Sequence, residues 1–182
     1  MKVLLHICCG PCLIYPLKAL RGEGFSVDGF FYNPNIHPYT EFKKRMEAME
    51  DFAKVEGLVV ASEVGYDMEH FIQTVSEHVD ERHGYCYEMR LRKTAQAAKD
   101  SGYAAFSTTL LYSKYQNHAL IVQMGNVVAN EIGIPFLYRD FREGWKEGQN
   151  VSRELGMYRQ KYCGCIYSEK ERFFKEEKVP VG

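Results

Sequence analysis

The sequence predicts an α/β fold in which helices flank a mostly parallel sheet. Apolar stretches of strand length alternate with longer stretches of helical periodicity, and this order is typical of parallel strands joined by crossover helices. The chain has 182 residues, of which 46% are hydrophobic, so it can fill one core of ordinary size. We therefore expect a single domain over 1–182, with a Rossmann-like core over about 1–140 and a cysteine-containing C-terminal segment over about 141–182.

The first 56 residues carry the clearest signals for individual elements. Apolar residues run together over 2–7 and over 25–32, as in buried strands, and the second run ends at the turn signal Asn33-Pro34-Asn35. A helix over 13–21 lies between them and completes a βαβ unit. A threonine can cap the next helix, expected over 40–56, because apolar residues recur there at helical spacing.

The remaining sequence continues the alternation. We expect further strands over 58–62, 103–107 and 135–138, and further helices over 68–78, 87–101 and 115–131. In such a sheet the functional site lies beyond the carboxyl ends of the strands. The chain places its polar motifs there: Cys8-Cys9-Gly10-Pro11-Cys12, Asn33-Pro34-Asn35, Thr108-Thr109 with Ser113-Lys114, and Arg139-Asp140-Phe141-Arg142. Cysteines occupy the first loop, where a glycine-rich phosphate cradle would stand, which argues against a dinucleotide or ATP.

Charge and hydropathy limit the partners and the compartment. The longest apolar runs fall far short of the roughly 20 residues that span a bilayer, and the N-terminus lacks the features of a signal peptide. We therefore expect a cytoplasmic protein without membrane contact. The net charge is −1, but residues 139–161 interleave basic residues with aromatic ones. Such a strip is typical either of a nucleic-acid surface or of an exposed, ion-paired face.

Six cysteines fall into three groups: Cys8, Cys9 and Cys12; Cys86; and Cys163 with Cys165. In a reducing compartment such cysteines are more often metal ligands or catalytic thiols than structural disulfides. The first group opens a predicted helix, whose positive end favours thiolates. We therefore take Cys8, Cys9, Cys12 and Cys86 as candidate metal ligands. An iron–sulfur cluster held from separate loops and a tetrahedral zinc site both suit them, although Cys9-x-x-Cys12 alone has the spacing of a zinc knuckle.

The pair Cys163-Gly164-Cys165 indicates redox chemistry. A disulfide across one intervening residue would close a small, strained ring that is easily reduced, so the pair can store two electrons. Alternatively, the two thiols add two metal ligands. Cys86 is expected to open the helix over 87–101, with His83 one turn earlier.

The chain carries several long motifs, which are His6-x-Cys8-Cys9-Gly10-Pro11-Cys12, residues 31–37, Cys86-Tyr87-Glu88-Met89-Arg90-Leu91 with Thr94-Ala95, residues 107–111 with Tyr115-Gln116-Asn117-His118, Tyr138-Arg139-Asp140-Phe141-Arg142, and residues 158–165. In this order, the motifs resemble those of the QueH-type epoxyqueuosine reductases. The resemblance implies a nucleotide-hydrolase-like Rossmann fold. It also implies the last step of queuosine synthesis in tRNA, in which the epoxide of epoxyqueuosine is reduced to an alkene with loss of water.

The resemblance implies a [4Fe-4S] cluster held by Cys8, Cys9 and a Cys-x-x-Cys whose second member matches Cys86. Its first member matches His83, and here the chain departs from the family pattern. Imidazole can replace thiolate on iron and raises the potential. The alternatives are that Cys12 serves as the ligand, that the cluster is a three-iron form, or that this member has no cluster. An additional iron beside the cluster is a further candidate. The family's redox-active pair matches Cys163 and Cys165 without change.

The implied reaction also needs an electron donor, an acid and a tRNA surface. We expect a ferredoxin- or flavodoxin-like donor, and Asp140, Tyr162 or His83 as the proton donor. The tRNA would be held by basic and aromatic residues, namely Arg139, Arg142, Arg159, Lys161, Tyr112, Tyr115 and Trp145. Two other classes compete: a zinc-binding structural or regulatory module, and a thiol-disulfide oxidoreductase that acts through Cys163 and Cys165 alone.

Overall fold

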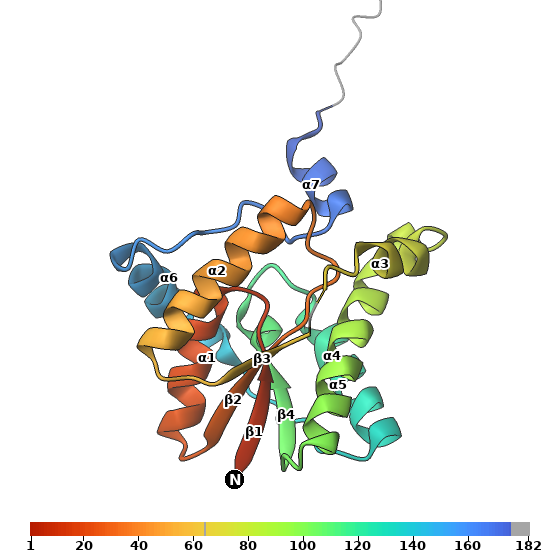
Figure 1. Cartoon of the computed structure of the whole chain (residues 1–182). Helices are drawn as coiled ribbons and strands as arrows, with labels where there is room; N and C mark the ends of the chain where they lie inside the picture. Colours follow the sequence, from red (N-terminus) through yellow and green to blue (C-terminus); the bar gives the residue numbers. More distant parts are fainter. Residues whose placement is uncertain (64, 176–182) are drawn as a thin grey trace, which may run out of the picture.

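The computed structural model describes residues 1–63 and 65–175, and it confirms the α/β class. Four parallel strands form one sheet in the order β3-β2-β1-β4, seen edge on in Figure 1. The strands are β1 (Lys2–His6), β2 (Ser26–Phe31), β3 (Val60–Ser62) and β4 (Ala105–Thr108). β1 lies between two neighbours, so its side chains from Val3 to His6 are buried and the strand reads as a continuous apolar run.

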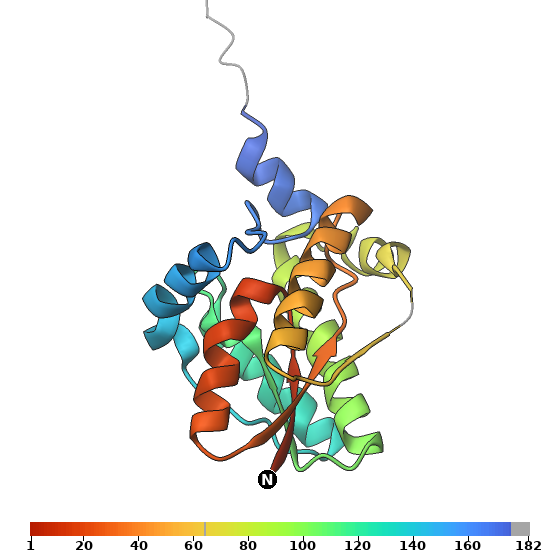
Figure 2. The same cartoon turned by 60° about the vertical axis from the view of Figure 1, so that its left-hand side comes forward.

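Helices cover both faces of the sheet. They are α1 (Gly10–Gly22), α2 (Tyr39–Val55), α3 (Met68–Val75), α4 (Arg82–Asp100), α5 (His118–Ile132), α6 (Trp145–Glu154) and α7 (Ile166–Phe173). Figures 1 and 2 show α1, α2 and α6 on one side, α4 and α5 on the other, and α7 beyond the carboxyl ends of the strands. Within the described residues, no helix combines the length and the apolar character needed to cross a bilayer.

The fifth strand, expected over 135–138, is reduced to a single parallel bridge between Phe136 and Phe106. Two backbone hydrogen bonds make it, from Phe106 N to Pro135 O (3.0 Å) and from Leu137 N to Phe106 O (2.8 Å). A proline cannot donate to a ladder, and beyond the bridge the chain leaves the sheet, where Arg139 binds Glu23 at the end of α1. The expectation of a regular strand there was wrong in extent.

The start of one helix and the structure of the C-terminal segment also differ from expectation. The helix expected over 87–101 begins at Arg82, so Cys86 lies in its second turn and does not open it. Tertiary contacts support the extra turn, because Tyr85 stacks on His78 at 5.3 Å between ring centroids and Arg82 pairs with Glu171. In addition, the segment expected only to carry Cys163 and Cys165 forms α6 and α7.

Candidate metal and redox site

The loop between β1 and α1 brings three sulfur atoms together at the carboxyl edge of the sheet. The Sγ atoms of Cys8, Cys9 and Cys12 all lie within 4.8 Å of one another, and those of Cys8 and Cys9 are 3.8 Å apart. Cys9 is the N-cap of α1 and Cys12 lies in its first turn, where Pro11 is tolerated because the first N–H groups have no helical partner. Cys9 and Cys12 are buried and Cys8 is half-buried.

Neighbouring loops fix this sulfur group. Thr109, which follows β4, accepts a hydrogen bond from Cys8 N (3.1 Å) and donates one to Cys8 Sγ (3.3 Å). Gln160, from the segment before α7, donates from Nε2 to Cys9 Sγ at 3.0 Å. The loops after β1 and β4 therefore meet as the sheet topology predicts, and the C-terminal segment covers them.

The three thiols have different electrostatic surroundings. Hydrogen bonds from Cys12 and Cys9 hold the pKa of Cys8 well below its usual range. Burial raises the pKa of Cys9, and the hydrogen bond to Cys8 raises that of Cys12. A thiolate at Cys8 is thus shared by two thiol donors. Three soft sulfur donors this close suit iron or zinc, because metal binding displaces the remaining thiol protons.

Cys86 and His83 do not join this group. Within the described part of the chain, the candidate metal-binding atoms that form a group of three or more within 4.8 Å of one another are the sulfurs of Cys8, Cys9 and Cys12. Cys86 packs instead in a separate buried cluster that includes Cys165. Burial raises the pKa of Cys86 to about 12. His83 is half-buried and its ring stacks on Tyr87 at 6.3 Å.

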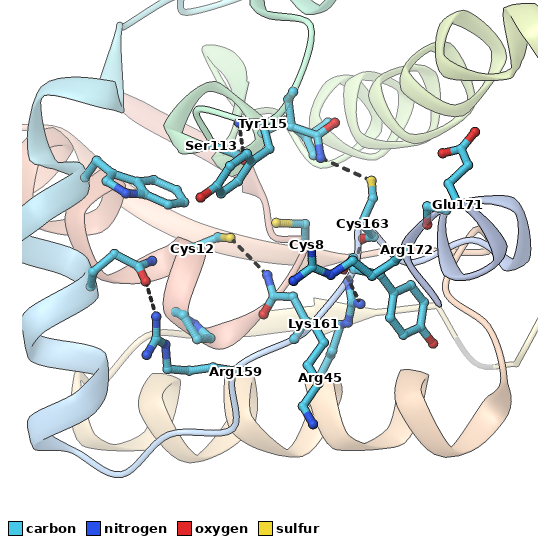
Figure 3. A pocket seen from close by; sticks show the side chains of 18 of the residues that line it. Cys8, Cys12, Arg45, Ser113, Tyr115, Arg159, Lys161, Cys163, Glu171 and Arg172 are labelled. Carbon is cyan, nitrogen blue, oxygen red and sulfur yellow. Dashed lines mark hydrogen bonds between the residues drawn. The ribbon is translucent and has the colours of Figure 1, made fainter. Parts of the chain in front are cut away.

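A pocket of about 670 Å³ opens beside the sulfur group, and Cys8, Cys12 and Cys163 line it together (Figure 3). Cys163 is exposed, and Gln116 donates from Nε2 to its Sγ at 3.2 Å. Cys165 is buried at the N-cap of α7, where its Sγ accepts from Ser168 N at 3.4 Å. The two cysteines of the pair therefore differ in access, since Cys163 faces the pocket and Cys165 does not line it.

The predicted basic and aromatic strip divides into two parts. Arg159, Lys161, Tyr115 and Trp145 line the pocket, and the Tyr115 side chain is 87% exposed (Figure 3). Tyr115 and Trp145 meet edge to face with their ring centroids 5.5 Å apart. Tyr112, by contrast, is fully buried beneath Trp145.

The other part of the strip lies away from the pocket. Arg139 binds Glu23 at 2.8 Å and Arg142 binds Asp140 at 2.6 Å. The hydrogen bond from Arg142 lowers the pKa of Asp140 to about 2. Asp140 is therefore a paired carboxylate outside the pocket lining, and the expectation that it acts as the proton donor finds no support.

Of the three expected proton donors, Tyr162 lines the pocket. Within the described residues, neither Asp140 nor His83 does. Its hydroxyl donates to the carbonyl oxygen of His37, and burial raises its pKa to about 12. It therefore stays protonated at neutral pH.

Four polar residues at the site contact the cysteines or their backbone, and the sequence did not predict these contacts. Gln116 and Gln160 donate to cysteine sulfurs, while the buried Arg90 donates from Nη2 to Cys86 Sγ at 3.0 Å. Arg45, also buried, binds the backbone of the Cys163 segment. Three of them stand inside the motifs shared with the reductases, but a lone glutamine or arginine in a motif carries no local signal of sulfur contact.

Comparisons with known proteins bear on the whole chain. The family model described as "Epoxyqueuosine reductase QueH" matches residues 3–171. A relative of that name from Dehalococcoides mccartyi is 41% identical over 174 residues, covering 96% of this chain and 96% of the relative. Another from Thermotoga maritima is 36% identical over 186 residues, covering 97% and 95%.

One solved structure shares the fold. It is that of a predicted subunit of tRNA methyltransferase from Methanocaldococcus jannaschii, with a TM-score of 0.59 and 14% identity, covering 85% of this chain and 75% of that chain. At this identity the likeness extends to the fold alone. The motif resemblance, the family match and the two relatives agree over nearly the full length, and this chain belongs to the QueH family of epoxyqueuosine reductases.

Proposed function

We propose that this chain reduces epoxyqueuosine in tRNA to queuosine. The observation that carries the proposal is the pocket, which presents the sulfurs of Cys8, Cys12 and Cys163 on one lining in a member of this family. Conversion of the epoxide to an alkene breaks two C–O bonds, consumes two electrons and two protons, and releases the oxygen as water. The site must therefore supply electrons and a proton close to the bound epoxide.

The donor set suits an iron–sulfur cluster. Three free cysteine sulfurs lie within 4.8 Å of one another, two of them buried, and thiolates are the usual ligands of such clusters. In our proposal Cys8, Cys9 and Cys86 hold a [4Fe-4S] cluster. The choice of Cys86 follows the family pattern, since its sulfur lies outside the three-sulfur group in this structure and must approach that group when the cluster binds. Cys12 is favoured over His83 as the fourth ligand, because its sulfur already lies in the group. When bound, the cluster would relay electrons one at a time from a ferredoxin- or flavodoxin-like donor to restore the Cys163–Cys165 dithiol after each turnover, and an additional iron beside it would act as a Lewis acid.

Cys163 and Cys165 supply the electron pair in this proposal. Oxidation of two thiols to a disulfide releases two electrons and two protons, which equals what one epoxide consumes. Cys163 faces the pocket and Cys165 lies behind it, so the first can approach substrate while the second completes the disulfide. An external reductant must then reopen the disulfide before the next turnover.

The pocket sets how the tRNA is held. At about 670 Å³ it lies within the usual 300–1,000 Å³ of small-molecule sites, so it suits one extruded nucleobase and excludes a duplex. We propose that the modified base leaves its stack and lies against Tyr115 and Trp145, while Arg159 and Lys161 neutralise phosphates. Tyr162 lines the same pocket as a protonated phenol and is our candidate to protonate the departing oxygen, for which its hydroxyl must turn from the carbonyl oxygen of His37 toward the substrate.

The test is an anaerobic assay. The purified chain, reduced with dithionite, is incubated with tRNA that carries epoxyqueuosine, and the digested nucleosides are separated and weighed by mass spectrometry. We expect a nucleoside lighter by one oxygen atom, and C163S should form far less of it than the wild type. Unchanged epoxyqueuosine after incubation with iron-loaded, reduced wild-type protein would sink the proposal.

Zinc remains a second candidate because three sulfurs within 4.8 Å also suit a tetrahedral site. A zinc-bound module predicts colourless protein with stoichiometric zinc and no reductase activity.

A thiol-disulfide oxidoreductase that acts through Cys163 and Cys165 alone can also be distinguished from the epoxyqueuosine reductase. It predicts disulfide reduction that survives replacement of Cys8, Cys9, Cys12 and Cys86 together.

A further inference from the structure

Arg45 of α2 is a buried arginine that binds the backbone of the cysteine pair. Its side chain is 2% exposed, and its Nη1 donates to Cys163 O at 2.7 Å while Nη2 donates to Tyr162 O at 3.0 Å. Both acceptors lie more than a hundred residues after Arg45 in the sequence. Figure 3 shows Arg45 reaching toward the Cys163 segment from the helix below it. The planar fork of a guanidinium can bind two carbonyl groups at once, which the ammonium of a lysine cannot do with the same geometry.

The remaining nitrogen of this fork is paired with a buried carboxylate. Arg45 Nε donates to Glu41 Oε1 at 2.7 Å, and the other oxygen of Glu41 accepts from the hydroxyl of Tyr158. A buried ion pair is costly to desolvate and adds little to stability by itself. Here both partners bind the segment over 158–163. The pair is therefore better explained by the geometry it imposes on that segment than by stability.

The turn after Cys163 is held against the same surface. His37 N donates to Gly164 O at 2.8 Å, and Gly164 N donates to the Ser168 hydroxyl at 3.1 Å. Gly164 has φ +149°, a conformation that side-chain-bearing residues rarely adopt, and an added Cβ would lie 3.2 Å from Arg45 Nη1. The carbonyl groups of three successive residues, Tyr162 to Gly164, thus have fixed partners from outside the segment.

We propose that the Arg45–Glu41 pair is the positioning element of the Cys163–Cys165 redox pair and favours its dithiol form. The inference rests on the proposed function of those two cysteines. Closing a disulfide across one residue reshapes the peptide groups on both sides of Gly164, and these are the groups that Arg45 and His37 hold in the free-thiol structure. The Arg45–Glu41 pair therefore keeps Cys163 reduced and facing the pocket until the substrate oxidises it.

The test is a thiol-disulfide titration of the full-length chain. The protein is equilibrated with glutathione buffers, quenched by alkylation, and the fraction of Cys163–Cys165 disulfide is read by peptide mass spectrometry. The reaction balances as dithiol plus glutathione disulfide giving protein disulfide plus two glutathiones. We expect R45Q to raise the equilibrium constant for disulfide formation by at least about tenfold, because it removes hydrogen bonds from a charged donor, R45K by less, and Y158F least.

The matched control is Arg92, which pairs with Glu88 four residues earlier on α4, as Arg45 does with Glu41, but on an exposed face. R92Q should leave the equilibrium unchanged, and circular dichroism identifies any variant that fails to fold. An R45Q constant within twofold of wild type, a shift toward the dithiol, or no disulfide in either protein overturns the proposal. Because the titration needs no tRNA, a chain without reductase activity would defeat the proposed function and leave this inference standing.

Discussion

Cys8 and Cys12 differ in surroundings although both belong to one short motif. Neighbouring thiols hold the pKa of Cys8 below its usual range, whereas hydrogen bonding to Cys8 raises that of Cys12. Metal binding requires all of them as thiolates, so the metal must displace protons on binding. The sequence pointed to this group of sulfurs, because three cysteines within five residues exceed what packing needs, and the structure places the three sulfurs within 4.8 Å of one another. It could not choose between Cys12 and His83, since that choice depends on where α4 begins.

The ligand choice is testable by single substitutions. We expect C12S to lower the iron content of anaerobically purified protein strongly, because the Cys12 sulfur lies in the three-sulfur group. H83C should leave iron occupancy unchanged, because His83 lies outside it. Iron and sulfide analysis of both variants checks this. A gain of iron in H83C together with full occupancy in C12S would show instead that position 83 carries the fourth ligand.

Gly10 gives a second prediction at the residue level. A Cβ there would lie 2.5 Å from Ala48 O, so the first turn of α1 can approach α2 only with glycine. We expect G10A to lower the free energy of unfolding by about 1–3 kcal/mol, as overpacking does, and to reduce metal content by shifting the cysteine loop. G22A at the other end of α1 meets no atom within 4 Å, so it should leave the metal content unchanged and should not lower the free energy of unfolding, because alanine is the better helix former. Equal urea midpoints for both variants would contradict this reading.

The position of α7 depends on contacts from a distant part of the chain. Its first N–H group, from Ile166, donates to His37 Nδ1 at 3.3 Å, and His37 Nε2 donates to Pro34 O at 3.0 Å. The imidazole is thus neutral, with one nitrogen accepting and the other donating. The sequence could not place α7 because this short helix owes its position to these contacts, whereas the long, periodic α2 could be predicted from its own pattern.

The state of His37 predicts a pH dependence of stability. Burial lowers the pKa of His37 below its usual 6.5, and that of the fully buried His6 falls to about 4. The unfolded chain therefore binds more protons than the folded one below about pH 6.5. The contribution of these two histidines to the free energy of unfolding should be constant above that pH and fall as the pH drops toward 4.

Comparison with H37Q isolates one of the two histidines. Glutamine can also donate and accept, so H37Q should fold, retain the decline due to His6, and show a shallower total slope than the wild type. Urea unfolding at several pH values between 4 and 8 measures both slopes. Identical slopes for the two proteins would mean that His37 does not titrate in this range.

For the whole molecule, the positive charge useful to RNA is local. The net charge of the chain is −1, and of the basic residues in the predicted strip, Arg159 and Lys161 line the pocket while Arg139 and Arg142 bind acidic neighbours. The strand and helix pattern predicted the sheet and the edge that carries the site. The pattern could not show which basic residues line the pocket and which form ion pairs elsewhere. That distinction depends on where the fifth strand ends, since beyond it Arg139 lies beside Glu23.

Substitutions in the two groups of basic residues are predicted to have different effects on tRNA binding. We expect the double variant R159Q/K161Q to weaken binding at low salt and to reduce the salt dependence of the affinity, because about two phosphate contacts are lost. R139Q/R142Q removes the same charge and should bind like the wild type. Affinities measured by filter binding across a range of salt concentrations compare the two. Equal losses in both variants would mean that net charge, not the pocket, sets the affinity.

The central claim is that the cysteine site of this chain holds a redox-active iron–sulfur centre. The most direct measurement is the visible spectrum of protein purified without oxygen, with iron, sulfide and zinc analysis and addition of dithionite. The account predicts brown protein with about four iron and four sulfide per chain whose absorbance bleaches on reduction. Colourless protein that carries zinc and no sulfide would contradict it and favour the zinc-bound module.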